Sequence, residues 1–259
     1  MDYVNFGTTG LSVSRLSIGT GTNGWGHRSD QTALGLDGLA RLLQQGFERG
    51  INFWDVADQY GSHPHVAHAL HTLPRDQIVI ATKTHARSQS GALKDIDRFL
   101  VELETDVIDI VLLHCLMQPQ WPKHYSGVME ALSRAKTDGK IRAVGVSCHS
   151  FGALQAAAAS EWVDVVLVRI NYAGINMDDS PDMVSSIIQQ MYASGKAVYG
   201  MKVLGGGRLR HDAEKAVRYV LNLRTVYSIT IGASSISQLE ENVRLVNSLS
   251  PSFPLKEKL

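Results

Sequence analysis

The chain has 259 residues, of which 44% are hydrophobic and 19% are charged, and its 25 basic residues balance its 25 acidic residues. A formal net charge of zero argues against a protein that binds nucleic acid or acidic membranes through a strong field. The composition also excludes disorder on a large scale. The two cysteines, Cys115 and Cys148, are too few for a disulfide scaffold or a cysteine-rich zinc site.

Targeting signals are also missing from the sequence. The N-terminus has no long apolar core of the secretory type, and no run of about 18 apolar residues occurs anywhere. We therefore expect a cytoplasmic protein with no membrane partner and no nucleic-acid partner.

Eight short apolar runs recur along the chain with longer amphipathic segments between them. The strand-like runs are 16–20, 52–57, 78–83, 109–114, 142–147, 164–171, 197–204 and 228–233. Most are continuous rather than alternating, which is typical of parallel strands buried on both faces. Helical patterns between them include 36–50, 92–106, 125–140, 181–196, 212–223 and 235–249.

The spacing of these runs predicts how the chain closes. One strand–helix unit occupies roughly 30 residues, and eight such units fill the chain. The simplest arrangement is an α/β fold with a single (β/α)8 TIM barrel as one domain over 1–259. A doubly wound open sheet is the alternative. Residues 3–13 precede the first barrel strand and have the pattern of a β-hairpin, which we expect to cap the barrel bottom.

Ionisable residues stand at the ends of three consecutive runs. Asp55, Lys83 and His114 each interrupt an apolar stretch, and Tyr60 follows Asp55 by five residues. Barrel enzymes carry their sites at the carboxyl ends of the strands, so these side chains are expected to meet. Such a group suits proton transfer to a carbonyl oxygen: Tyr60 is the acid, and the Lys83 ammonium lowers its pKa. Asp55 balances Lys83, and His114 donates a hydrogen bond to the carbonyl oxygen.

Several motifs in chain order resemble those of the aldo-keto reductase family. They are INFWDVADQYGS, IATKTH, DIVLLH, GKIRAVGVS, GKAVYGMKVLGGGRL and ITIGASSISQLEEN. The resemblance implies catalysis by Asp55, Tyr60, Lys83 and His114, with Tyr60 as general acid or base in reversible hydride transfer between a nicotinamide cofactor and a carbonyl. It also implies a monomer that acts on a small carbonyl or alcohol substrate, such as an aldehyde, a ketone or a sugar.

The resemblance further assigns a set of binding residues. NADP(H) is favoured as cofactor, and NAD(H) remains possible because no basic residue occurs from Gly232 to Asn242. Trp25 and His85 are the candidate substrate residues. The candidate cofactor residues are Thr20, Ser147, Asn171, Met201, Lys202, Leu204, Gly206, Arg208, Gly232, Ser234, Ser235, Gln238, Glu241 and Asn242.

Alternative functions remain open at this point. Leu167 and Cys148 replace the residues that commonly hold the carboxamide in the family, so a slow or non-catalytic cofactor-binding subunit is possible. A Schiff-base aldolase that uses Lys83 is another alternative.

Two further expectations concern the histidines and the end of the chain. His63, His65, His68 and His71 are expected to form a polar helix face, and no metal site is predicted. The segment 250–259 is too short for a large lid, which predicts an open, shallow substrate site.

Overall fold

The computed structural model of the protein describes residues 1–249. Within this range no helix is long and apolar enough to cross a bilayer. The prediction about 250–259 and the open site lies outside the described residues.

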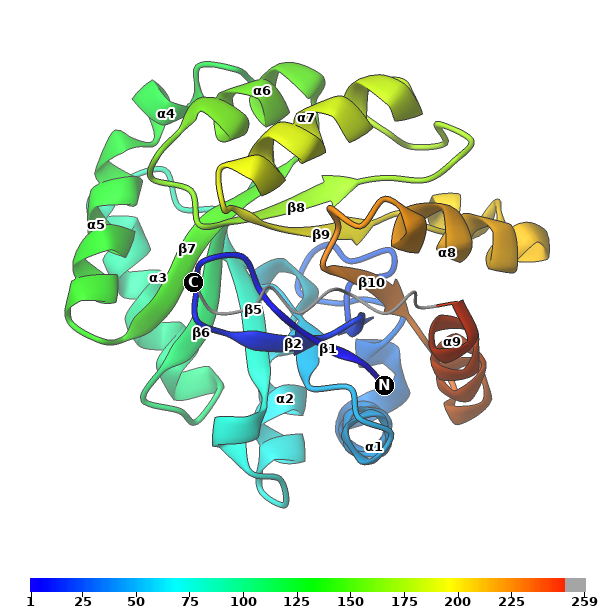
Figure 1. Cartoon of the computed structure of the whole chain (residues 1–259). Coiled ribbons are helices and arrows are strands. Elements are labelled where there is room, and N and C mark those ends of the chain that lie inside the picture. The colour runs from blue at the N-terminus through cyan, green and yellow to red at the C-terminus, as the bar shows by residue number, and fades with distance from the viewer. Residues whose placement is uncertain (250–259) are drawn as a thin grey trace.

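Eight parallel strands within residues 1–249 form a closed barrel (Figure 1). The order around the barrel is β10-β3-β4-β5-β6-β7-β8-β9, so the last strand pairs with the first. This confirms the predicted (β/α)8 architecture. The strands are β3 (Leu16–Gly19), β4 (Phe53–Asp55), β5 (Val79–Thr84), β6 (Ile108–Leu116), β7 (Ile141–Cys148), β8 (Val165–Arg169), β9 (Ala197–Met201) and β10 (Ser228–Gly232).

Helices surround the barrel on its outer side (Figure 1). They are α1 (Gly35–Glu48), α2 (His63–Leu70), α3 (Gln89–Glu102), α4 (Trp121–His124), α5 (Ser126–Thr137), α6 (Phe151–Ala159), α7 (Pro181–Ala193), α8 (Ala213–Asn222) and α9 (Ile236–Leu249). Short 3-10 turns are η1 (Thr32–Leu34), η2 (Asp58–Tyr60), η3 (Arg75–Gln77), η4 (Gly205–Gly207) and η5 (Arg210–Asp212). Helix α6 was not among the predicted segments, because its alanine run lacks a clear polar face.

Local sequence explains where several elements begin and end. The Ser180 hydroxyl accepts a hydrogen bond from the backbone N–H of Met183, and Pro181 occupies the first turn of α7. Strand β9 ends at Met201 because Lys202 adopts a left-handed backbone with φ of 57°. The predicted run 197–204 is therefore too long by three residues.

Alternation along the strands places the inner side chains in columns. Phe53, Ala81 and Leu112 belong to the apolar cluster inside the barrel. Because side chains two residues apart share a face, the next inward residues are Asp55, Lys83 and His114. A polar layer therefore lies above the inner apolar cluster, at the carboxyl ends of these strands.

The hairpin closes the opposite end of the barrel. Strands β1 (Tyr3–Asn5) and β2 (Ser12–Ser14) pair antiparallel and lie across the barrel in Figure 1. The backbone N–H of Thr8 donates to the Gly195 carbonyl (3.0 Å), just before β9 begins. The structure thus confirms that the hairpin caps the bottom.

Phe6 is the side chain that this hairpin inserts into the barrel. It is fully buried, and its ring meets Phe53, Tyr199 and Tyr227 edge-on, with centroids 5.4, 6.0 and 5.9 Å away. Such aromatic contacts add to the stabilisation from burial of apolar area. The hairpin is therefore part of the inner core.

Replacement of Phe6 by Ala should leave a cavity in this aromatic cluster. We expect Phe6→Ala to reduce the free energy of unfolding by about 3–5 kcal/mol, measured by urea denaturation. Tyr3→Ala is the matched control, because that ring is 47% exposed on the same hairpin and should cost far less. Equal losses in the two variants would contradict a core role for Phe6.

Candidate active site

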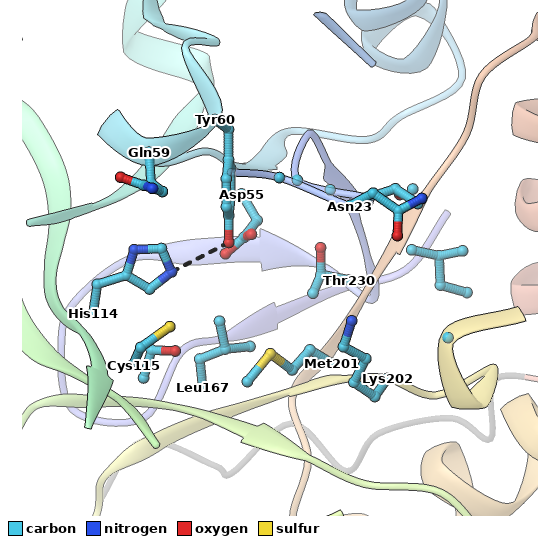
Figure 2. Close-up of a pocket in the computed structure, with 18 of the residues that line it drawn as sticks. Asn23, Asp55, Gln59, Tyr60, His114, Cys115, Leu167, Met201, Lys202 and Thr230 are labelled. Carbon is cyan, nitrogen blue, oxygen red and sulfur yellow. Dashed lines mark hydrogen bonds between the residues drawn. The ribbon is translucent and has the colours of Figure 1, made fainter. Parts of the chain in front are cut away.

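A cavity of about 640 Å³ opens at the carboxyl ends of the barrel strands. Among the predicted catalytic residues, Asp55, Tyr60 and His114 line it, and Lys83 lies buried beneath it. Figure 2 shows Tyr60 and His114 facing each other, with Met201 and Lys202 on another wall of the same cavity. The structure therefore brings together the residues that the strand-end pattern singled out.

Lys83 and Asp55 form a buried ion pair below the cavity. The Lys83 Nζ donates to both carboxylate oxygens of Asp55 (2.9 Å each) and to the Val56 carbonyl (2.8 Å). Lys83 is 0% exposed and Asp55 is 4% exposed. With three acceptors around it, the ammonium has no free position for addition to a carbonyl, which disfavours the Schiff-base aldolase.

Tyr199 supplies a further hydrogen bond to this pair. Its hydroxyl, from β9, donates to Asp55 Oδ2 (2.7 Å). Burial, together with the adjacent Asp55 carboxylate, raises the pKa of Tyr199 well above its usual range, so the phenol stays protonated and remains a donor. Tyr199 occupies the inward position of β9 two residues before Met201, but its role beside Asp55 was not evident from the sequence.

The ring of Tyr60 is held by glycine backbone from the loop after β3. A Cβ at Gly21 would lie 2.3 Å from a Tyr60 ring carbon, and one at Gly24 would lie 2.4 Å from another. Any other residue at these two positions would force the ring or the loop to move. The two glycines therefore set how closely the loop approaches Tyr60.

Tyr60 and His114 meet at the end of the cavity. The distance from Tyr60 Oη to His114 Nε2 is 3.4 Å, and Lys83 Nζ lies 5.1 Å from the Tyr60 ring centroid. The expectation of a lowered Tyr60 pKa is wrong for this structure. Burial raises that pKa well above its usual range, and the adjacent Asp55 carboxylate adds to the effect.

Burial also keeps the histidines of the cavity neutral. It lowers the pKa of His114 to about 2, with a smaller contribution from the Lys83 charge. Burial likewise lowers the pKa of His149, at the end of β7, to about 4. Neutral imidazole at His114 can donate one hydrogen bond and accept another.

The opposite wall of the cavity carries many of the predicted cofactor residues. Ser147, Met201, Lys202, Leu204, Gly206 and Gly232 all line it. The hydroxyls of Ser147 and Thr230 are buried there and have no hydrogen-bond partner within the described residues. Such orphaned polar atoms are costly unless a ligand satisfies them, so this wall fits a ligand with polar groups.

Other predicted cofactor residues do not line the cavity. Thr20 bonds to the Asp55 carbonyl and to Ser62, and the Asn171 amide donates to the carbonyls of Ile175 and Lys202. Arg208 donates to Asn176.

The residues around the start of α9 also lie outside the cavity lining. Ser235 and Gln238 bond at the N-terminus of α9, where the Ser235 hydroxyl accepts from the Gln238 N–H and the Gln238 side chain accepts from the Ser234 N–H. Glu241 and Asn242 lie on α9 itself. For all of these residues, cofactor contact remains a prediction.

The two predicted substrate residues lie at different depths. Trp25 lines the mouth and is 72% exposed, whereas His85 is half-buried and stacks on His114 with ring centroids 4.4 Å apart. Sequence reasoning missed Asn23, Gln59, His149 and Thr230, which also line the cavity. Asn23 lies in the loop after β3 and Gln59 in the 3-10 turn η2, where no strand periodicity could reveal them.

The histidines after Tyr60 face separate partners. His63 bonds to Glu102 and Thr82, His68 to Asp37, and His71 to Glu104. The His68 and His71 rings meet edge-on with centroids 5.6 Å apart, but each bonds a different carboxylate. His63 is 1% exposed, so the expectation that it belongs to a polar helix face is wrong.

Known proteins resemble this chain in both sequence and fold. A model of the Aldo/keto reductase family matches residues 15–215. The chain is 27% identical to L-galactose dehydrogenase of Arabidopsis thaliana over 94% of this chain and 87% of that protein. It is 24% identical to L-glyceraldehyde 3-phosphate reductase of Escherichia coli, over 99% and 90% of the two chains.

A solved structure shows the same fold. The holo form of an aldo-keto reductase from Bacillus halodurans matches with a TM-score of 0.77 at 22% identity, over 100% of this chain and 99% of that chain.

Loss of the Tyr199 hydroxyl should weaken the buried pair without creating a large cavity. We expect Tyr199→Phe to lower the free energy of unfolding by about 1–3 kcal/mol, because a buried charged acceptor loses a donor. Tyr3→Phe, at a half-exposed ring, should change stability by less than about 0.5 kcal/mol. Urea denaturation of both variants measures the difference, and no loss in Tyr199→Phe would contradict the assigned hydrogen bond.

The depressed pKa of His114 predicts a pH-dependent stability. Below pH about 6.5 the unfolded chain binds a proton at this residue and the folded chain does not, so stability falls as the pH drops towards the folded pKa of about 2. In His114→Gln that loss should be smaller by about 1 kcal/mol per pH unit. Urea denaturation at pH 7.5, 6.5 and 5.5 tests this, and identical slopes in the two proteins would refute it.

Proposed function

The chain belongs to the Aldo/keto reductase family, and on that premise we propose that it is an oxidoreductase that interconverts a small carbonyl and its alcohol with a nicotinamide cofactor. The observation that carries the proposal is the meeting of Asp55, Lys83, Tyr60 and His114 at one end of a single cavity.

Tyr60 is the proposed general acid in reduction. Its raised pKa keeps the phenol protonated at neutral pH, so the proton is available for transfer. The oxygen produced by reduction is an alkoxide, which is a stronger base than a phenolate, so the transfer remains favourable. In oxidation the same oxygen, as phenolate, takes the proton back.

Lys83 and His114 act on either side of that transfer. The Lys83 ammonium lies 5.1 Å from the Tyr60 ring centroid, so it stabilises negative charge that develops on the ring system. His114 is neutral and 3.4 Å from the Tyr60 hydroxyl, so its ring can orient the carbonyl oxygen that Tyr60 protonates. Asp55 positions Lys83 and neither donates nor accepts the proton that Tyr60 transfers.

The wall opposite Tyr60 fits the cofactor. A nicotinamide cofactor, when bound, supplies or accepts the hydride. Ser147 and Thr230 would meet its polar groups, because both hydroxyls are buried without a partner. Lys202 and the glycine turn η4 would face its phosphates. NADP(H) follows from the family, and the lack of a basic residue from Gly232 to Asn242 leaves NAD(H) as the other candidate.

The substrate is proposed only by class. L-galactose dehydrogenase and L-glyceraldehyde 3-phosphate reductase are named for a sugar and a sugar phosphate. The mouth of this cavity carries Asn23, Gln59 and the exposed ring of Trp25, a combination that suits a polar substrate with several oxygens. We therefore propose an aldehyde, a ketone or a sugar.

One observation favours a second candidate, a slow or non-catalytic cofactor-binding subunit. Leu167 lines the cavity and offers no polar atom to a carboxamide, and Cys148 is fully buried. Steady turnover of aldehydes, sugars or secondary alcohols with NADPH or NADH would remove this candidate. Binding of cofactor without turnover of any of them would favour it.

Replacement of Tyr60 by Phe tests the proposed acid. We expect Tyr60→Phe to lower kcat by at least about 100-fold, because the transferred proton is lost, and to leave cofactor affinity largely unchanged. Affinity is measured by quenching of reduced-cofactor fluorescence. Tyr219→Phe is the control, since that hydroxyl lies 3.4 Å from Ser185 between α7 and α8. Full activity in Tyr60→Phe would overturn the assignment.

A further inference from the structure

Strand β6 breaks the normal alternation of side chains at the cavity. His114 and Cys115 are consecutive, yet both line the cavity. The pairing of β6 with β7 shifts register between Leu113 and Leu116, and Cys115 has a left-handed backbone with φ of 57°. This irregularity, like a β-bulge beside an active site, aims an extra side chain inward. It adds a thiol beside the imidazole of His114.

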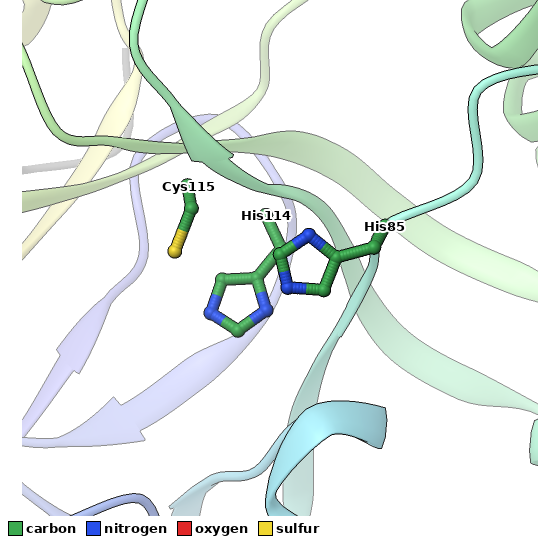
Figure 3. A group of neighbouring side chains, drawn as sticks. All are labelled: His85, His114 and Cys115. Atoms are coloured by element: carbon green, nitrogen blue, oxygen red, sulfur yellow. The ribbon is translucent and has the colours of Figure 1, made fainter. Parts of the chain in front are cut away.

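Two more imidazoles reach the same place. His85, just after β5, stacks on His114 with an interplanar angle of 30° (Figure 3). One ligand atom each from His85, His114 and Cys115 lies within 4.8 Å of the others. On the other side, His149 Nε2 lies 3.6 Å from Cys115 Sγ. Three strand ends thus gather three nitrogen ligands and one sulfur ligand.

The ring nitrogens of this cluster are incompletely satisfied. His114 is 4% exposed, and its Nδ1 has no hydrogen-bond partner among the described residues. His85 Nε2 is buried and unpartnered in the same way. Buried polar atoms left open at a cavity are typical of a position that a ligand completes.

A second cluster shows what a satisfied group looks like. Asp58, His63 and Glu102 also bring ligand atoms within 4.8 Å of one another. There the Arg98 guanidinium donates to Asp58 (2.7 Å) and to Glu102 (2.8 Å). The positive charge of Arg98 therefore already neutralises the two carboxylates. Within residues 1–249 no lysine or arginine hydrogen-bonds the side chains of His114 or Cys115, although the Lys83 charge acts on both through space.

We propose that His85, His114 and Cys115 bind one zinc-class divalent cation, with His149 beside the sulfur as a fourth ligand or its hydrogen-bond partner. Nitrogen and thiolate ligands are those that Zn²⁺ prefers, in tetrahedral sites with ligand atoms about 3.5 Å apart. The ligand atoms lie within 4.8 Å of one another, so the cluster has to close towards this spacing, and half-buried His85 just after β5 can turn to allow it. Cys115 binds as thiolate, and its proton passes to solvent.

Occupation of this site would inhibit the reaction. This consequence rests on the proposed function, because it follows from the position of His114, 3.4 Å from the Tyr60 hydroxyl. A cation held by His114 Nε2, the nitrogen that faces the Tyr60 hydroxyl, lies where the carbonyl oxygen would approach and removes that nitrogen from hydrogen bonding. The cation therefore competes with the carbonyl substrate.

Binding is tested on the full chain without cofactor or substrate. Titration with Co²⁺ should reach one ion per chain and give the thiolate-to-cobalt absorption of a sulfur ligand, and Zn²⁺ should displace the cobalt. Cys115→Ser should abolish the thiolate absorption, and His85→Gln should weaken binding at least tenfold. Cys148→Ala is the control, because Cys148 is a fully buried thiol outside the cavity lining. It should bind like the wild type.

Two results would overturn the site. One is the lack of stoichiometric binding by the wild-type chain. The other is a thiolate absorption that survives Cys115→Ser or disappears in a folded Cys148→Ala variant. Thermal unfolding of each metal-free variant establishes that it is folded, and half-buried His85→Gln provides a test that does not disturb β6.

Inhibition is measured separately in turnover assays. Zn²⁺ should raise the apparent KM for the carbonyl in the wild type and do so at least tenfold less effectively in Cys115→Ser. Metal binding without any carbonyl turnover would refute the proposed function and leave the metal site standing. Turnover that Zn²⁺ leaves unchanged, at concentrations where Co²⁺ and Zn²⁺ bind, would refute the inhibition.

Discussion

The buried contact between Lys83 and Asp55 is the interaction on which the rest of the site depends. Removal of two charges from water costs several kcal/mol for each ion, and a nearly unexposed pair recovers this only through close hydrogen bonds. Here the ammonium has three acceptors, and the carboxylate has Lys83 and Tyr199 as donors. The partners come from three strands, β4, β5 and β9, and the bond from Tyr199 forms only when β9 faces β4 across the barrel.

The pair also connects the two ends of the barrel. The Tyr199 ring that bonds Asp55 packs against Phe53 and against Phe6 of the hairpin, with centroids 5.1 and 6.0 Å away. A chain of edge-on and tilted aromatic contacts therefore runs from the plugged bottom to the polar layer at the top. Because ring packing in a dense interior leaves little room for displacement, the hairpin constrains the position of Asp55 although it lies far from the cavity.

Particular residues show what could be predicted from sequence. The positions of Asp55, Lys83 and His114 could be predicted from each strand alone. Side chains alternate along a strand, and barrel enzymes carry their sites at the carboxyl ends of the strands. The bond from Tyr199 to Asp55 could not be predicted in this way, since it depends on how β9 is staggered relative to β4 across the barrel. The pKa of Tyr60 was predicted in the wrong direction because the proximity of Lys83 could be inferred from the strand-end pattern, whereas the burial of the Tyr60 ring could not.

The inward orientation of the Cys115 side chain could not be predicted from the sequence for a related reason. A register shift changes which face a residue occupies without changing composition, so DIVLLHCL has the pattern of a regular buried strand. In a regular strand, His114 inward means Cys115 outward, and the cavity would contain imidazole but no thiol there. The local break in β6 therefore decides the chemistry of this wall. It places the Cys115 sulfur, a soft metal ligand, beside the histidine that faces Tyr60. A cation bound to that sulfur would therefore also affect the proposed proton transfer from Tyr60.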